Sequence, residues 1–178
     1  YEEVLDDEQD VLEVAKELGL GKALDVAKDH PDAYVIGSDT IVVVDGKQLA
    51  KPADAAEAKE MYALLSNRTH QVVTSIAVVC LNEGIQDVGV ESVSITFDEL
   101  TEEFMDAYIA TRNPFDKAGG YAVQHPLVKE HVVSIEGRLD TLIGLPTKTM
   151  SELLNRHGFD TQPLNLTDKL LAQTGMHE

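Results

Sequence analysis

An aspartate and a lysine flank a strongly apolar segment of this sequence, GSDTIVVVDGKQLAKP (37–52). Asp39 precedes a run of β-branched residues, and Lys51 follows it beyond Asp45-Gly46, a dipeptide typical of hairpin turns. Because a hairpin sets its arms about 5 Å apart, we expect Lys51 to lie near Asp39. A carboxylate at this place could hold a divalent metal or a water molecule. The same residues also fit a loop-capping aspartate and a structural salt bridge.

The loop PFDKAGGYAVQ (114–124) is the second candidate site. Paired glycines allow a backbone to approach a ligand closely. Lys117 supplies a positive charge, which either acts on a ligand or pairs with Asp116. The side-chain amide of Gln124 has the donor and acceptor needed to read the edge of a base. Spacing alone leaves open whether this loop is functional.

The sequence argues against several classes of protein. The six histidines do not cluster at zinc-like spacing, and the sequence has no G-x-S-x-G, no P-loop and no G-x-G-x-x-G. The 32 acidic residues outnumber 14 basic ones, which is the reverse of a nucleic-acid-binding protein. No apolar run approaches the ~20 residues of a membrane span, and no secretory leader is visible. The single cysteine, Cys80, also favours a reducing, cytoplasmic location.

The pattern of apolar residues predicts the elements that must position these candidates. We expect helices over 10–29, 54–66, 101–111 and 147–157, and strands over 34–44, 48–51, 71–81, 87–98 and 131–136. Asp54 followed by Glu57 is typical of a helix N-cap with its capping partner, and Gly158 of a C-terminal cap. Strands and helices are mixed, which predicts one α/β or α+β domain around a twisted mixed sheet.

Four segments together resemble one family, the Maf (septum-formation-inhibitor-like) nucleoside triphosphate pyrophosphatases. In the family's order and spacing they are 37–52, SNRTHQVVTSIAVV (66–79), 114–124 and EGRLDTLIGLPT (136–147). The resemblance implies an elongated α/β domain over residues 1–158 with a nucleotide-binding cleft, followed by a C-terminal extension, 159–178. It also implies hydrolysis of a nucleoside triphosphate to the monophosphate and pyrophosphate, with Mg or Mn as the divalent metal. Members of the family often form homodimers, so we expect one here.

The resemblance assigns three catalytic residues and a metal site. Asp39 matches the family's acidic residue, which holds metal or activates water. Lys51 matches the lysine of G-K-P, and Lys22 that of E-K-A, and both are expected to contact phosphates. Glu3 lies at about the right distance before Lys22 to match a family glutamate near the metal.

The resemblance also implies the substrate. Gln124 matches the glutamine of Y-x-x-Q, which reads the base, and Thr40 stands where members preferring dTTP and UTP carry threonine. We therefore expect a pyrophosphatase for dTTP, UTP and related modified pyrimidine triphosphates, with Ser38, Thr40, Lys117 and Gln124 binding the substrate. The alternatives are an N7-methyl-GTP pyrophosphatase and a catalytically impaired regulator that only binds nucleotides.

Three departures from the family pattern bear on these expectations. The family begins with a strand and a phosphate-binding S-x-S-P-R-R turn, and Tyr1 stands where the segment after that motif would begin. We expect the domain either to lack this strand and motif or to have them upstream of Tyr1. Ala50 replaces a glycine, and Asp140-Thr141 stand where relatives often have an aromatic residue and an asparagine.

Overall fold

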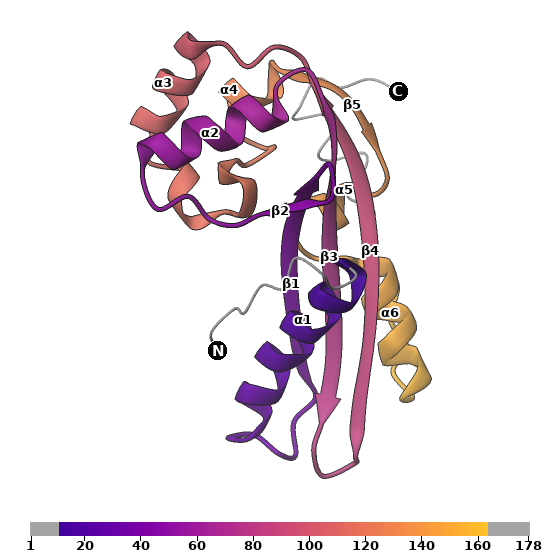
Figure 1. Cartoon of the computed structure of the whole chain (residues 1–178). Helices are drawn as coiled ribbons and strands as arrows, with labels where there is room; N and C mark the ends of the chain where they lie inside the picture. The colour runs from indigo at the N-terminus through magenta and orange to yellow at the C-terminus, as the bar shows by residue number, and fades with distance from the viewer. Residues whose placement is uncertain (1–10, 164–178) are drawn as a thin grey trace. The chain divides into compact units, whose positions relative to one another are not determined.

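The structure is a computed structural model that describes residues 11–163 (Figure 1). In chain order, its elements are α1 (Val11–Ala27), β1 (Val35–Val44), β2 (Lys47–Leu49), α2 (Ala55–Leu65), β3 (Thr69–Cys80), β4 (Ile85–Phe97), α3 (Glu102–Ala110), the 3₁₀ turns η1 (Pro114–Asp116) and η2 (Ala118–Gly120), α4 (Pro126–Lys129), β5 (Val132–Glu136), α5 (Leu139–Leu142) and α6 (Thr147–Arg156). Every predicted helix and strand is present within about two residues of its expected bounds. Between 11 and 163, no helix has the length and apolar character needed to cross a bilayer.

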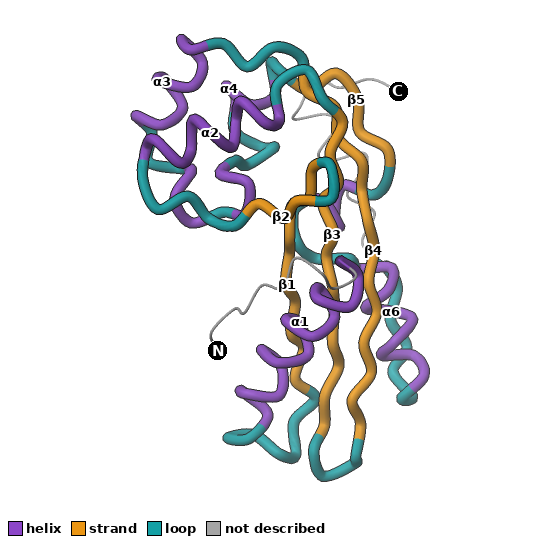
Figure 2. The backbone as a smooth tube through the Cα atoms, in the orientation of Figure 1, coloured by secondary structure: helices purple, strands orange, loops and turns teal. Residues whose placement is uncertain are grey.

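The five strands form one sheet in the order β2-β1-β3-β4-β5 (Figure 2). This arrangement of strands and helices confirms the predicted α/β class. At one edge, β2 pairs antiparallel with β1 from Val42↔Leu49 to Val44↔Lys47, and at the other edge β5 pairs antiparallel with β4. We expected a mixed sheet, but both of these edge pairs are antiparallel. For β1 and β2 the cause is the short turn between them, since a hairpin connection requires antiparallel neighbours.

The described residues divide into two compact units. Unit 1 contains residues 11–40, 73–92 and 138–163, and unit 2 contains residues 41–72 and 93–137. Each of the strands β1, β3 and β4 contributes residues to both units. Asp39 and Lys22 belong to unit 1, whereas Lys51, Lys117 and Gln124 belong to unit 2.

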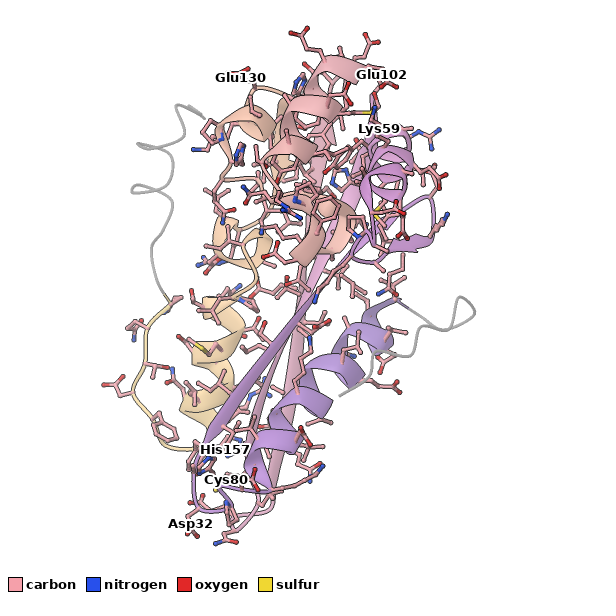
Figure 3. All side chains as sticks on the ribbon, turned by 90° about the vertical axis from the view of Figure 1, so that its left-hand side faces the viewer. Asp32, Lys59, Cys80, Glu102, Glu130 and His157 are labelled. Carbon is pink, nitrogen blue, oxygen red and sulfur yellow. The ribbon has the colours of Figure 1, made fainter. Side chains whose placement is uncertain are left out.

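Unit 1 places a helix on each face of its strands, as Figures 1 and 3 both show for α1 and α6. Side chains alternate between the two faces of a strand, and β3 follows this rule. Ala77 and Val79 pack against Ala23 and Ala27 of α1, whereas the intervening apolar residues of β3 pack against α6. Because β3 is covered on both faces, its sequence is a continuous apolar run rather than an alternating one.

The core of unit 2 is built largely from aromatic rings. Tyr62 of α2 packs with Phe104 and Tyr108 of α3, at ring-centroid distances of 5.9 and 6.1 Å. At the surface, Lys59 forms ion pairs with Glu102 and with an aspartate one turn further along α3, and Figure 3 labels the first pair. Such exposed pairs contribute about 1 kcal/mol or less, so the rings carry most of the contact between α2 and α3.

A second aromatic group in unit 2 surrounds a buried histidine. His70 Nε2 lies 2.7 Å from the hydroxyl of Tyr121, and both rings pack against Phe97. Burial lowers the pKa of His70 to about 4, so this ring is neutral near neutral pH. Burial also raises the pKa of Tyr121. Tyr121 is therefore a core residue of unit 2, although it lies in the glycine-containing loop.

Candidate functional site

Two glycines bring α1 unusually close to the strands of unit 1. A Cβ atom on Gly19 would lie 2.3 Å from Ser75 Oγ of β3, and one on Gly37 would lie 2.7 Å from Ala23 Cβ of α1. A side chain at either position would therefore push the helix away from the sheet. The sequence suggested only that glycine weakens the middle of this helix. The structure shows that Gly19 is the point where the helix meets the sheet.

The close approach of α1 brings Lys22 to Asp39. Lys22 lies one turn after Gly19 and forms an ion pair with the carboxylate of Asp39. Asp39 is only 8% exposed, whereas Lys22 is 36% exposed. A buried carboxylate is costly unless it is paired, and Lys22 provides that pairing here. The structure thus unites two of the three residues predicted to be catalytic.

Asp39 does not cap a loop, which was one alternative from the sequence. It lies inside β1, and both of its neighbours, Ser38 and Thr40, have side chains on the opposite face of the strand. Ser38 Oγ lies 2.8 Å from the carbonyl oxygens of Ser75 and Gly144. Thr40 Oγ1 lies 3.0 Å from Thr74 Oγ1. The strand therefore separates Ser38 and Thr40 from Asp39, although we grouped all three from the sequence.

On the side of β1 where Ser38 and Thr40 lie, the carboxylates of Asp140 and Glu91 hold the segment 138–149. Asp140 is 1% exposed and accepts hydrogen bonds from Arg138 Nε and Nη2, at 2.9 and 2.7 Å, and from the hydroxyl of Thr147. Burial alone would raise the pKa of Asp140, but the hydrogen bonds from Arg138 and Thr147 outweigh burial and lower it. Glu91 of β4 accepts from Thr141 Oγ1 at 2.6 Å. From the sequence, Asp140 was only a departure from the family pattern.

Lys51 of unit 2 is exposed and lies beyond the end of β2. The paired part of the hairpin stops at Val42↔Leu49, so it includes neither Asp39 nor Lys51. The shared site for these two residues therefore stays a prediction. The positive charge of Lys51 does act on Asp116, whose pKa is lowered by Lys117 first and by Lys51 to a lesser degree.

The loop 114–124 uses its special residues mainly for packing. A Cβ on Gly119 would lie 3.0 Å from Val42, and one on Gly120 would lie 3.2 Å from Pro52, so both glycines fit against the protein itself. Lys117 Nζ lies 2.5 Å from Asp116, so the ion pair that the sequence allowed is present. A contact between Lys117 and a substrate stays a prediction. Gln124 is exposed just after this packed turn. The loop thus packs against unit 2 and leaves Gln124 exposed at its surface.

From the described residues alone, a metal could bind at Asp39 only if a substrate supplied further ligands. In residues 11–163 no group of three or more His, Cys, Asp or Glu side chains could form a metal site by itself. Mg²⁺ commonly binds one or two carboxylates and takes its remaining ligands from phosphates and water. Asp39 supplies one such carboxylate. Glu3, the other predicted ligand, lies outside the described residues.

Comparison with known proteins points to one family. A family model described as Maf-like protein matches residues 1–157. A dTTP/UTP pyrophosphatase from Halalkalibacterium halodurans is 39% identical over 153 residues, which cover 84% of this chain and 77% of the relative. A protein of the same name from Shouchella clausii is 43% identical over 80% of this chain and 73% of its own length. One from Bacillus cytotoxicus is also 43% identical, over 75% of this chain and 69% of its own length.

Proposed function

Because the chain belongs to the Maf-like protein family, we propose that it is a nucleoside triphosphate pyrophosphatase that hydrolyses dTTP and UTP to the monophosphate and pyrophosphate. The similarity to proteins named dTTP/UTP pyrophosphatase over most of the chain carries this proposal. The Lys22–Asp39 pair supports it, because it joins a carboxylate to a cation, the two kinds of group that phosphoryl chemistry needs. We further propose a homodimer, from the family resemblance, and a cytoplasmic location, in keeping with the free, buried thiol of Cys80.

In the proposed reaction, Asp39 acts as general base. Its carboxylate takes a proton from a water molecule while the water oxygen bonds to the α-phosphorus. The bond from the α-phosphorus to the α,β-bridging oxygen breaks, and pyrophosphate leaves with the bonding electrons. Lys22 and Lys51 offset the negative charge that gathers on the leaving group. A bound Mg²⁺ or Mn²⁺, held by Asp39 and the phosphates, would neutralise further charge.

A pyrophosphate-release assay tests this function directly. The full chain should release pyrophosphate from dTTP and UTP in the presence of Mg²⁺, and faster than from N7-methyl-GTP. Equal or greater release from N7-methyl-GTP would transfer the substrate assignment to that nucleotide. Tight binding of dTTP without release of pyrophosphate would identify a nucleotide-binding regulator instead.

Gln124 provides the first prediction for substrate choice. We propose that its amide pairs with the pyrimidine edge, to which it can offer both a donor and an acceptor. Gln124→Glu removes the donor, so we expect kcat/KM for dTTP to fall about 10-fold or more relative to N7-methyl-GTP. A panel of nucleotide substrates measures this shift. Because Gln124 is exposed, the melting temperature should stay unchanged, and an unaltered substrate profile would remove Gln124 from recognition.

A further inference from the structure

Gln124, the residue proposed to read the base, lies in the middle of a tight turn of unit 2. The backbone N–H of His125 donates to the carbonyl of Ala122 at 3.0 Å, which makes Val123 and Gln124 the two central residues of a β-turn. Val123 is buried and Gln124 is exposed, so the turn fixes one central side chain in the core and presents the other to solvent. The position of the Gln124 amide therefore depends on how firmly the two ends of this turn are held.

Tyr108 of α3 contacts both ends of the turn. Its hydroxyl oxygen accepts a hydrogen bond from the backbone N–H of Ala122 at 2.9 Å. Its ring packs edge-on against the ring of His125, with the two centroids 4.9 Å apart. Edge-to-face aromatic pairs are stabilising beyond the area that they bury. One side chain thus holds the first and the last residue of the turn that carries Gln124.

The ring of Tyr108 is itself fixed by the core of unit 2. It is wholly buried, stacks on Phe104 with centroids 5.7 Å apart, and packs against Tyr62 at 6.1 Å. Because protein interiors are closely packed, a ring in such surroundings has little freedom to move. The hydroxyl of Tyr62 also donates to the carbonyl of Gly120 at 2.5 Å, two residues before Ala122. Side chains of α2 and α3 therefore hold the segment 120–125 at several points.

His125 links the end of the turn to the helix that follows it. Its Nδ1 atom accepts a hydrogen bond from the backbone N–H of Leu127 at 3.3 Å, and His125 is the N-cap of α4. A capping side chain satisfies a backbone donor that the helix leaves without an internal partner. The cap and the contact with Tyr108 together restrain the ring of His125. The residue directly after Gln124 is therefore held from two sides.

We propose that Tyr108 is a positioning residue for recognition of the base. It acts through Gln124, because by holding Ala122 and His125 it keeps the Gln124 amide where the edge of the pyrimidine binds. Tyr108 itself is wholly buried and does not contact the nucleotide. This inference rests on the proposed pyrophosphatase function and on the base-reading role proposed there for Gln124. The alternative is that Tyr108 only packs the core of unit 2, in which case its hydroxyl has no effect that depends on Gln124.

Tyr108→Phe removes the hydroxyl and keeps the ring, so it tests the hydrogen bond to Ala122. Calorimetry with α,β-imido-dUTP and Mg²⁺ should show binding about 3- to 10-fold weaker than in the wild type, the size of effect of one lost hydrogen bond. KM for dTTP should rise by the same factor while kcat changes less than about 2-fold, because the base contact is made in the ground state as well as in the transition state. The melting temperature should fall by only a few degrees.

Tyr34→Phe is the matched control, since the hydroxyl of Tyr34 also forms a hydrogen bond, to Glu83, but in unit 1. It should leave the affinity for α,β-imido-dUTP within about 2-fold of the wild type. The proposal is overturned if Tyr108→Phe binds the analogue as tightly as this control does.

A double-mutant cycle shows whether Tyr108 acts through Gln124. Gln124→Ala removes the amide and should weaken binding of α,β-imido-dUTP about 10-fold. In this background Tyr108→Phe should weaken binding by less than about 2-fold further, because no amide is left to position. If the two effects multiply instead, Tyr108 supports binding independently of Gln124 and the inference is wrong.

His125→Asn tests the same idea without changing the core of unit 2. Asparagine can still cap α4, but it lacks the ring that packs on Tyr108. We expect it to weaken binding of α,β-imido-dUTP about 3-fold while Gln124 is present and by less than about 2-fold in the Gln124→Ala background. This variant decides the proposal if Tyr108→Phe does not fold, and equal effects in the two backgrounds would contradict it.

The same measurements separate this inference from the proposed function. If the wild type binds α,β-imido-dUTP but releases no pyrophosphate from dTTP or UTP, the proposed function fails and the cycle still decides the role of Tyr108. If Gln124→Ala leaves the affinity unchanged, the inference fails, whereas release of pyrophosphate by the wild type upholds the function. If the wild type binds no analogue and releases no pyrophosphate, both proposals fall.

Discussion

Asp39→Asn is expected to lower the rate of pyrophosphate release from dTTP by about 10²- to 10⁴-fold, the size of effect typical of a lost general base. Asparagine has nearly the same shape as aspartate but cannot take a proton from water. KM should change much less than kcat, because the substitution leaves Lys22 and Lys51, the proposed phosphate ligands, in place. The measurement is steady-state kinetics at saturating dTTP and Mg²⁺, together with the melting temperature of the same preparation.

The melting temperature decides whether Asp39 serves catalysis or only a structural ion pair. Asp39→Asn leaves Lys22 without its negative partner, but Lys22 is 36% exposed and can turn toward water, so we expect a shift of only a few degrees. Asp25→Asn is the matched control, because Asp25 forms an ion pair with Lys28 at 3.0 Å and both side chains are exposed. This substitution should change neither kcat nor the melting temperature. A large loss of stability with little loss of kcat per folded molecule would favour the structural role.

The sequence predicted the longer elements well, because each has a strong local cause. The β-branched runs in β1 and β3 predicted buried strands, and both strands are observed. Asp54 accepts hydrogen bonds from Ala56 N and Glu57 N, as its predicted role of N-cap requires. Gly158, the predicted C-terminal cap, has the positive φ of +87° that this role favours. The four-residue helices α4 and α5 were missed, because one turn is too short to show a helical period.

The contacts of the candidate site were predicted less well, because they depend on which face of an element each residue occupies. Ser38, Asp39 and Thr40 are consecutive, and consecutive residues of a strand point to opposite sides. A prediction that groups them because they are adjacent in sequence misses this alternation. The pairing of Lys22 with Asp39 depends on Gly19, whose role emerges only when α1 is packed on the sheet. No local pattern of residues carries that information.

Arg138→Met is expected to lower the free energy of unfolding by about 2 kcal/mol at pH 7. Breaking one partner of a wholly buried pair costs roughly 3–5 kcal/mol. The cost here should be smaller, because Arg138 is 37% exposed although Asp140 is 1% exposed. Asp140 would keep its bonds from Thr147 and Thr141 but lose its cation. Urea titration measures the effect, with Lys28→Met as the exposed-pair control, for which we expect a change below about 0.5 kcal/mol.

The pH dependence of this loss has a sign that identifies its cause. In the wild type the pKa of Asp140 is lowered from 3.8, so its stabilising effect is present above about pH 4 and is lost as the pH falls through the lowered pKa. In Arg138→Met, burial still acts to raise the pKa of Asp140, but the hydrogen bond from Arg138, the largest cause that lowers it, is gone. The folded variant therefore takes up a proton on Asp140 more readily. The difference in stability between variant and wild type should therefore shrink as the pH falls from 7 toward about 4. A difference in stability that does not change with pH would show that Arg138 stabilises the protein by packing alone. The Asp140 carboxylate would then have no electrostatic role in holding the segment 138–149.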